Sequence, residues 1–217
     1  MSSASQRGLA RLALGIIVGV IAVSGMAWGQ MLFGLGEFPG GTLHVGYEII
    51  RTLDDGEKLY TTYTLDIFPN PDGTYTSRET FEAPNQELED LTTGMRRSAR
   101  AAVAGARYEE EERADIDLSP LQTLEEKGVQ VQPHQNYYLP DGARLITGEL
   151  SEIAGIQVVM GIYLHPGYPD QRVILAFAAD PEVAELLPML PLMIREVKGE
   201  EDIKTQLIEF SYTPPTQ

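Results

Sequence analysis

Residues 153–179 read IAGIQVVMGIYLHPGYPDQRVILAFAA, and this stretch decides the fold class. Two apolar runs rich in valine, isoleucine and aromatic residues flank a turn at 165–170 that contains proline and glycine. Such runs on either side of a turn predict a long β-hairpin made of residues 153–164 and 172–179. The second run is apolar at successive positions, which predicts a central strand covered on both faces.

Period-two patterning also occurs on either side of this hairpin. The first alternating apolar residues are Leu43, Val45, Tyr47 and Ile49. Turn signals at 54–56 and 70–73 separate two more alternating runs, and together these three runs predict an antiparallel meander. Further strands are predicted around the turn at 139–142 and in the runs 192–197 and 203–212.

Helical patterns occupy the middle of the chain and one later segment. The apolar residues that recur at three- and four-residue steps are Leu88, Leu91, Met95 and Ala99. Residues 119–128 are typical of a short helix with a Ser cap, a proline in its first turn and a C-terminal glycine, and 180–187 predicts another. With about eight strands, these elements predict an α+β domain, a mainly antiparallel curved sheet packed with two or three helices.

The N-terminal segment 12–36 contains 25 residues and no charge. As a helix it would be about 38 Å long, more than the roughly 30 Å of bilayer hydrocarbon. Arg7 and Arg11 precede it and acidic residues dominate the chain after residue 36, so the positive-inside rule places the N-terminus in the cytoplasm. The predicted organisation is a cytoplasmic n-region (1–11), a single-pass transmembrane signal-anchor helix (12–36), a linker (37–41) and an extracytoplasmic α+β domain (42–217), periplasmic or extracellular.

Cleavage of this segment is the alternative. Ala27 and Gly29 place small residues at the two positions that signal peptidase recognises, and Gln30 comes next. A cleaved chain would be secreted with Gln30 as its first residue. The uncharged run continues beyond this point, whereas a signal h-region usually spans 7–15 residues.

Small residues form a stripe on one side of the predicted membrane helix. At 100° per residue, the positions that share this side are Gly15, Gly19, Ala22, Gly25 and Gly29. Small residues at four-residue spacing let two membrane helices approach closely. The stripe predicts a helix-packing interface with other membrane-protein subunits, although glycine is also common in membrane helices in general.

Composition excludes several classes of function. The chain has a formal net charge of −16, so nucleic acid and anionic lipid headgroups repel it. It contains no cysteine, which excludes disulfides, thiol catalysis and thiolate metal sites. The sequence predicts no nucleic-acid partner and no cofactor.

No catalytic or metal-binding pattern stands out. His44, His134 and His165 have no short mutual spacing, so a zinc site would require the fold to gather them. The chain contains no Gly-x-Ser-x-Gly motif. We therefore predict a non-enzymatic protein with no catalytic, cofactor-binding or metal-ligating residues, and a hydrolase stays open as an alternative.

Two features suggest a contact surface for a partner or ligand. Tyrosines cluster near turns, and tyrosine is enriched at interfaces. The apolar, proline-broken segment 183–194 suits a docking ridge or a lid, and core packing is the alternative for both features. The candidate contact residues are Tyr137, Tyr138, Tyr163, Tyr168, Leu190, Leu192 and Met193.

The leading prediction is a membrane-anchored extracytoplasmic accessory or structural subunit of a membrane protein complex. Its partners would be other membrane-protein subunits, reached through the transmembrane helix and the acidic domain. A curved antiparallel sheet can also hold an apolar ligand, so a periplasmic binding or carrier domain for lipid is the alternative function.

Overall fold

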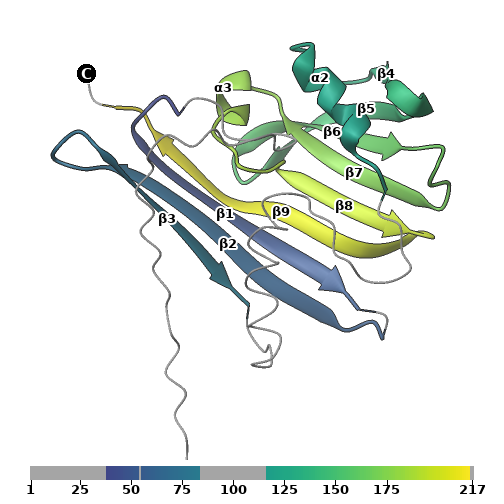
Figure 1. Cartoon of the computed structure of the whole chain (residues 1–217), viewed down its shortest axis with the longest axis horizontal. Coiled ribbons are helices and arrows are strands. Elements are labelled where there is room, and N and C mark those ends of the chain that lie inside the picture. The colour runs from purple at the N-terminus through teal and green to yellow at the C-terminus, as the bar shows by residue number, and fades with distance from the viewer. Residues whose placement is uncertain (1–37, 54, 84–115, 216–217) are drawn as a thin grey trace, which may run out of the picture.

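The computed structural model of the chain describes residues 38–53, 55–83 and 116–215 (Figure 1). These residues form a nine-stranded antiparallel sheet with the strand order β3-β2-β1-β9-β8-β7-β6-β5-β4. The strands are β1 (Thr42–Thr52), β2 (Lys58–Pro69), β3 (Tyr75–Glu82), β4 (Asn136–Tyr138), β5 (Arg144–Ile153), β6 (Ile156–Leu164), β7 (Gln171–Ala178), β8 (Leu192–Val197) and β9 (Glu200–Thr213).

The expectation of an α+β domain with packed helices is wrong. The described residues form a large antiparallel sheet accompanied by one-turn helices: α2 (Gln122–Glu126), α3 (Pro181–Ala184) and the 3₁₀ turns η1 (Ser119–Leu121) and η2 (Pro140–Gly142). The sequence patterns at 119–128 and 180–187 do form helices, but these helices are short. Gly128, with φ of +61°, ends α2, and Pro188 comes soon after α3.

Two predicted helices lie outside the described residues: the mid-chain helix with Leu88 to Ala99, and the membrane span 12–36 with its helix-packing residues Gly15, Gly19, Ala22, Gly25 and Gly29. Within the part of the chain that the structure describes, no helix has the length and apolarity needed to cross a bilayer.

The predicted meander and hairpin are both confirmed. β1 pairs with β2 and β2 with β3, and β6 pairs with β7 across the turn at 165–170. The first strand of the hairpin, predicted at 153–164, begins three residues later, however. Ala154 (φ +49°) and Gly155 (φ +80°) turn the chain, so Ile153 ends β5 and Ile156 begins β6. A two-residue turn with positive φ at both positions matches the twist of a hairpin.

The core consists of two apolar clusters that meet at β7. Val173, Leu175 and Phe177 belong to the cluster that includes Leu121 and Leu124 from η1 and α2. The intervening residue Ala176 belongs to the other cluster, with Leu192 and with Tyr47 of β1. Because successive side chains of a strand point to opposite faces, β7 is covered on both sides, as its sequence predicts.

The short helices η1 and α2 supply apolar cover for one face of β6 and β7. Leu121 is 1% exposed and packs in the same cluster as Tyr163 and Leu175. Burying a leucine side chain contributes about 1.5–3 kcal/mol, so even a one-turn helix can hold this face through a few side chains.

Candidate functional site

Four isoleucines stand opposite one another on four adjacent strands. The strand register pairs Ile146 with Ile162, Ile162 with Ile174, and Ile174 with Ile194. Residues that are paired in this way share a face of the sheet, and this face is the one opposite α2, since Tyr163 and Val173 point the other way. We call these four residues the isoleucine row.

The isoleucine row is partly open to solvent. Ile146 and Ile162 are each 38% exposed, and Ile174 and Ile194 are half-buried. On β7, Ile174 is two residues from the buried Ala176, so the row is the exposed margin of the apolar cluster on this face. An exposed apolar margin on a rigid sheet is a candidate contact surface.

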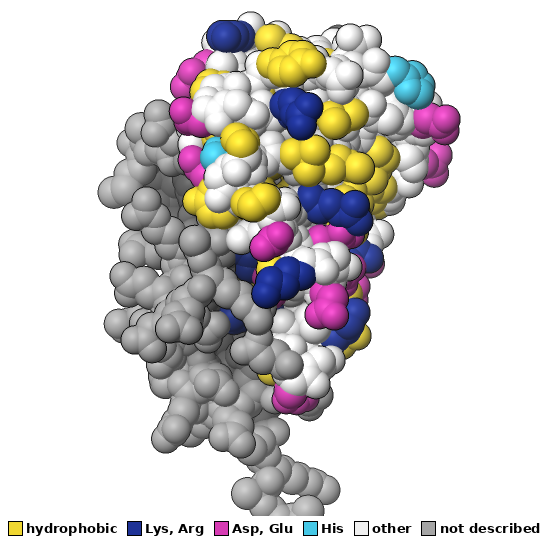
Figure 2. All heavy atoms as spheres, turned by 90° about the vertical axis from the view of Figure 1, so that its right-hand side faces the viewer, with side chains coloured by type: hydrophobic (Ala, Val, Ile, Leu, Met, Phe, Trp, Pro, Cys, Tyr) yellow, Lys and Arg dark blue, Asp and Glu magenta, His cyan; other side chains and the backbone are white. Residues whose placement is uncertain are grey.

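Basic side chains accompany the row. Arg144 lies two residues before Ile146 on β5, and Lys204 pairs with Ile194 in the register of β8 and β9. Arg172 lies two residues before Ile174 and forms an ion pair with Glu196. Figure 2 shows the molecule from the side that is on the right in Figure 1. Hydrophobic side chains gather in the upper half of this view, with lysine and arginine among them, and Figure 1 places β4–β7 in that upper part.

A hollow of about 210 Å³ opens beside the row, where β5 begins and the β6–β7 turn folds over. Its lining residues are Gly142, Arg144, Leu164, His165, Pro166, Tyr168, Pro169 and Gln171. The hollow opens to solvent and mixes apolar walls with an arginine. It is adjacent to the isoleucine row because Arg144 and Leu164 each lie two residues from a member of that row.

The wall of the hollow is a turn held by several hydrogen bonds. The backbone N–H of Tyr168 donates to the carbonyl of His165 (2.9 Å), and that of Gln171 donates to the carbonyl of Tyr168 (3.1 Å). The N–H of Gly167 donates to Nδ1 of His165 (3.0 Å), and the rings of His165 and Tyr168 meet edge to face with centroids 5.2 Å apart. The turn therefore holds its shape without a ligand.

This turn is also tied to its neighbours. The N–H of Lys198, in the β8–β9 turn, donates to the carbonyl of Asp170 (2.7 Å). The hydroxyl of Tyr163 donates to the carbonyl of Asp117 (2.6 Å), and the Asp117 carboxylate accepts from the backbone N–H of Ser119 (2.9 Å), which lowers the pKa of Asp117. Nε2 of His165 is buried, with no hydrogen-bond partner among the described residues.

Arg144 differs from the other arginines near this face. Arg172 is paired with Glu196, and Arg195 with Asp202. Arg144 forms no ion pair with any carboxylate of the described residues, although the chain has a net charge of −16. An unpaired guanidinium at the rim of an apolar hollow offers several N–H donors to an acidic group.

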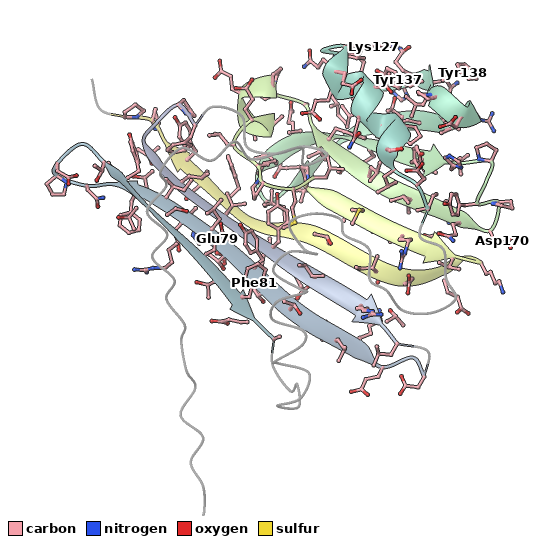
Figure 3. All side chains as sticks on the ribbon, in the orientation of Figure 1. Glu79, Phe81, Lys127, Tyr137, Tyr138 and Asp170 are labelled. Atoms are coloured by element: carbon pink, nitrogen blue, oxygen red, sulfur yellow. The ribbon has the colours of Figure 1, made fainter. Side chains whose placement is uncertain are left out.

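The tyrosines singled out from the sequence divide between core and surface. Tyr163 is fully buried, and Tyr137 is half-buried with its hydroxyl accepting from the N–H of Gln132 (2.7 Å). Tyr138 is 80% exposed, and Tyr168 lines the hollow. Figure 3 places Tyr137 and Tyr138 beside α2 and Asp170 at the outer end of the sheet.

The apolar candidates from segment 183–194 lie against the core. Leu192 is 8% exposed and belongs to the cluster around Tyr47. Leu190 and Met193 are partly buried against the other cluster. The same segment is bound to β1, because the hydroxyl of Tyr47 donates to the carbonyl of Met189 (2.6 Å). In this structure the segment serves packing.

The three histidines remain apart. His44 contacts Asp66 and Glu209, His165 shapes the hollow, and His134 is exposed with φ of +55°. Across the ranges that the structure describes, no group of three or more histidine and carboxylate residues could hold a metal ion. A non-enzymatic role therefore stays a prediction, and so does the lipid-carrier alternative.

Sequence reasoning missed the isoleucine row and Arg144. Ile162 and Ile174 have apolar or glycine neighbours on both sides in the sequence, so the pattern there did not distinguish the buried face from the exposed one. The available signal was the β5 run after the turn at 139–142, in which Arg144 and Ile146 share a face by simple alternation. Only pairing across strands brings the four isoleucines together.

Comparisons with known proteins give a distant likeness. No protein-family model matches the chain, and no curated protein matches it. Two solved structures are similar: the crystal structure of MucB (TM-score 0.42, 12% identity, covering 82% of this chain and 56% of that one) and the complex of MucA and MucB from Pseudomonas aeruginosa (TM-score 0.39, 12% identity, 82% and 54%). The chain spans little more than half the length of these structures, and at this level the likeness identifies no function.

Proposed function

We propose that the chain is a non-enzymatic accessory subunit whose β-sheet domain binds a partner protein outside the cytoplasm. The single observation that carries this proposal is the isoleucine row, four apolar side chains aligned across β5–β8 on the face opposite α2. Contiguous exposed apolar side chains on a rigid surface support association with another protein.

The free energy gained by covering the isoleucine row indicates what kind of interface it could form. Ile146 and Ile162 each keep 38% of their surface exposed. Covering this exposed part with a partner contributes only about 1 kcal/mol for each side chain. Ordering and desolvation costs oppose this gain. The row must therefore act together with neighbouring anchors, and the adjacent hollow and basic side chains are the groups available on the same face.

Attachment to the membrane is the second part of the proposal. Residues 12–36 form an uncharged stretch long enough to span a bilayer, with Arg7 and Arg11 before it and an acidic chain after it. The stripe that includes Gly19 would pack against a helix of another membrane subunit. This orientation implies a periplasmic or extracellular location for the sheet domain.

The test is native purification of the full-length chain from membranes, with mass spectrometry of the proteins recovered with it. The Ile146→Asp and Ile162→Asp variants should each recover at least tenfold less of a specific partner. Val129→Asp is the matched control, since Val129 is 37% exposed but lies outside the row, after α2. Gly19→Leu tests the membrane contact separately.

Two results would contradict the proposal. One is a wild-type chain that is recovered alone. The other is partner recovery that is lost to the same extent in the Val129→Asp control as in the two isoleucine variants, since that would indicate damage to the fold. Circular dichroism and thermal melting of each variant show whether the sheet remains intact.

A further inference from the structure

We infer that the hollow beside the isoleucine row is an anchor site for an extended acidic-apolar peptide segment of the partner, which places a carboxylate on Arg144 and an adjacent apolar side chain in the hollow. This inference rests on the proposed function, because it names the chemistry of the partner that the isoleucine row contacts. Size, wall chemistry, charge and position each support it.

The volume of the hollow selects the size of the ligand. Sites for cofactors and drug-sized molecules are generally about 300–1,000 Å³. A hollow of about 210 Å³ is too small for a lipid chain or a cofactor. Its size suits one amino-acid side chain. A side chain presented by a peptide is the ligand that fits this space.

The walls of the hollow favour an apolar side chain. Leu164, Pro166, Tyr168 and Pro169 supply hydrocarbon and one aromatic ring. Their turn is already held by backbone hydrogen bonds and by the contact between the His165 and Tyr168 rings. A preformed wall loses little conformational entropy when it binds, which favours affinity from a small contact.

Arg144 selects the charge of the ligand. Its guanidinium lies at the rim and pairs with no carboxylate of the described residues, and a planar guanidinium can bind a carboxylate through two parallel hydrogen bonds. Asp141 and Asp170 lie in the two adjoining turns, and their negative charge opposes any anion, so the contact with Arg144 alone gives little affinity. An acid that lacks an apolar anchor should therefore bind poorly, whereas a carboxylate beside an apolar side chain gains both contacts.

The position of the hollow sets the length of the segment. From β5 to β8 the isoleucine row crosses three strand spacings, about 14 Å in all at roughly 4.8 Å each. An extended chain of about five residues covers this distance at roughly 3.3 Å per residue. Arg144 and Ile146 share a face of β5, so a peptide anchored in the hollow continues directly onto the row.

The experiment uses the full-length chain in detergent and fluorescein-labelled octapeptides of alternating glutamate and leucine, read by fluorescence anisotropy. The wild type should bind this peptide, and replacing every glutamate by lysine or every leucine by serine should weaken binding at least tenfold. Arg144→Glu should weaken it at least tenfold, whereas Arg144→Lys should keep part of the affinity because it keeps the charge.

Lys127→Glu is the matched control, because it makes the same change of net charge as Arg144→Glu at an exposed residue after α2 (Figure 3). It should leave the affinity unchanged. Equal binding by wild type and Arg144→Glu, or equal binding of the glutamate and lysine peptides, would overturn the inference. Competition by free hexanoate at the same concentration as the peptide would also overturn it, because the site would then accept small carboxylic acids.

Failure of this inference can be distinguished from failure of the proposed function. If Ile162→Asp abolishes recovery of the partner while the peptide does not respond to Arg144→Glu, the protein-binding role stands and the hollow is not its anchor. If the wild-type chain is recovered alone but binds the peptide through Arg144, the peptide site stands without the accessory role. Self-association of the chain, detected by sedimentation and abolished by Arg144→Glu, would identify a second copy as the occupant and overturn the inference.

Discussion

His44 lies between two carboxylates that come from different strands. Its Nδ1 is 2.7 Å from Oδ1 of Asp66 on β2, and its Nε2 is 2.8 Å from Oε2 of Glu209 on β9. These hydrogen bonds, with Asp66 first and Glu209 second, raise the pKa of His44. Arg78 on β3 stands opposite Asp66 on its other side and adds a positive charge to this row.

We predict that this cluster makes stability depend on pH. Because the folded pKa of His44 is raised, its contribution is fully present below the unfolded value of about 6.5 and is lost as the pH rises through the folded pKa. The free energy of unfolding of the wild type should exceed that of His44→Gln by about 1 kcal/mol at pH 6, as expected for partly exposed ion pairs, and the difference should shrink by pH 9. Urea denaturation at both pH values measures it, and a difference that stays constant or grows with pH would refute the assignment.

A second prediction concerns the buried hydroxyl of Tyr163. Tyr163→Phe removes the donor to the carbonyl of Asp117 and leaves that acceptor unpaired, which should cost about 1–2 kcal/mol. Tyr138→Phe is the matched control, because Tyr138 is 80% exposed and its loss should change stability by less than about 0.5 kcal/mol. Thermal melting compares the two variants, and equal melting temperatures would mean that the Tyr163 hydrogen bond contributes no net stability.

At the scale of the element, turns were easier to predict than the side chain that caps each helix. Asp180 caps α3, since its carboxylate accepts from the backbone N–H of Glu182 (2.9 Å). Ser119 was expected to cap the earlier helix, but its N–H instead donates to the carboxylate of Asp117. Both residue types accept backbone hydrogen bonds, and the local backbone path decides which one does so.

The packing of β5 against β6 leads to a prediction at Gly161. A Cβ added at this position would lie 3.0 Å from Cδ1 of Leu145, in a fully buried part of the sheet. Gly161→Ala should destabilise the domain by about 1–3 kcal/mol through overpacking, a fall of several degrees in melting temperature. Gly148→Ala on β5 is the control, because its nearest neighbour, the carbonyl of Met160, is 4.0 Å away. An equal effect of both substitutions would show that strand conformation, not packing, sets the cost.

At the scale of the whole molecule, the first and last strands of the described chain pair with each other inside the sheet. β9 lies between β1 and β8, with Thr42 opposite Thr213 and Arg51 opposite Ile203. The three N-terminal strands are joined to the other five only through this last strand. The sheet therefore cannot be completed until the C-terminal strand is available.

Truncation tests this arrangement. A chain that stops before Glu200 lacks β9 and should fail to form a protease-resistant domain, because both halves of the sheet would expose an edge and the core around Leu207 would be opened. A chain that stops after Pro215 retains every strand and should fold as the full chain does. Limited proteolysis compares the two, and a resistant fragment that lacks β9 would contradict the topology.

The leader is also tested on the whole molecule. If residues 12–36 remain as a signal anchor, the intact mass of the native protein should correspond to a chain beginning at Met1 or Ser2, and alkaline carbonate should not extract it from membranes. A mature chain that begins at Gln30 would remove the membrane-attached part of the proposed function. It would leave the inference about Arg144 and the hollow unaffected.

The sequence by itself determined the strands, the turns and the central place of residues 173–179, because these depend on local alternation, proline and glycine. Only the tertiary structure decided that β9 inserts between β1 and β8, that Ile146, Ile162, Ile174 and Ile194 form one row, and that Arg144 faces a hollow without a carboxylate partner among the described residues. The physical reason is the range of the interactions: backbone preferences act over a few residues, whereas strand pairing and side-chain contacts join positions far apart in the chain. The same limit explains the error in fold class, since a helical pattern indicates that a helix begins but not how much of the sheet it covers.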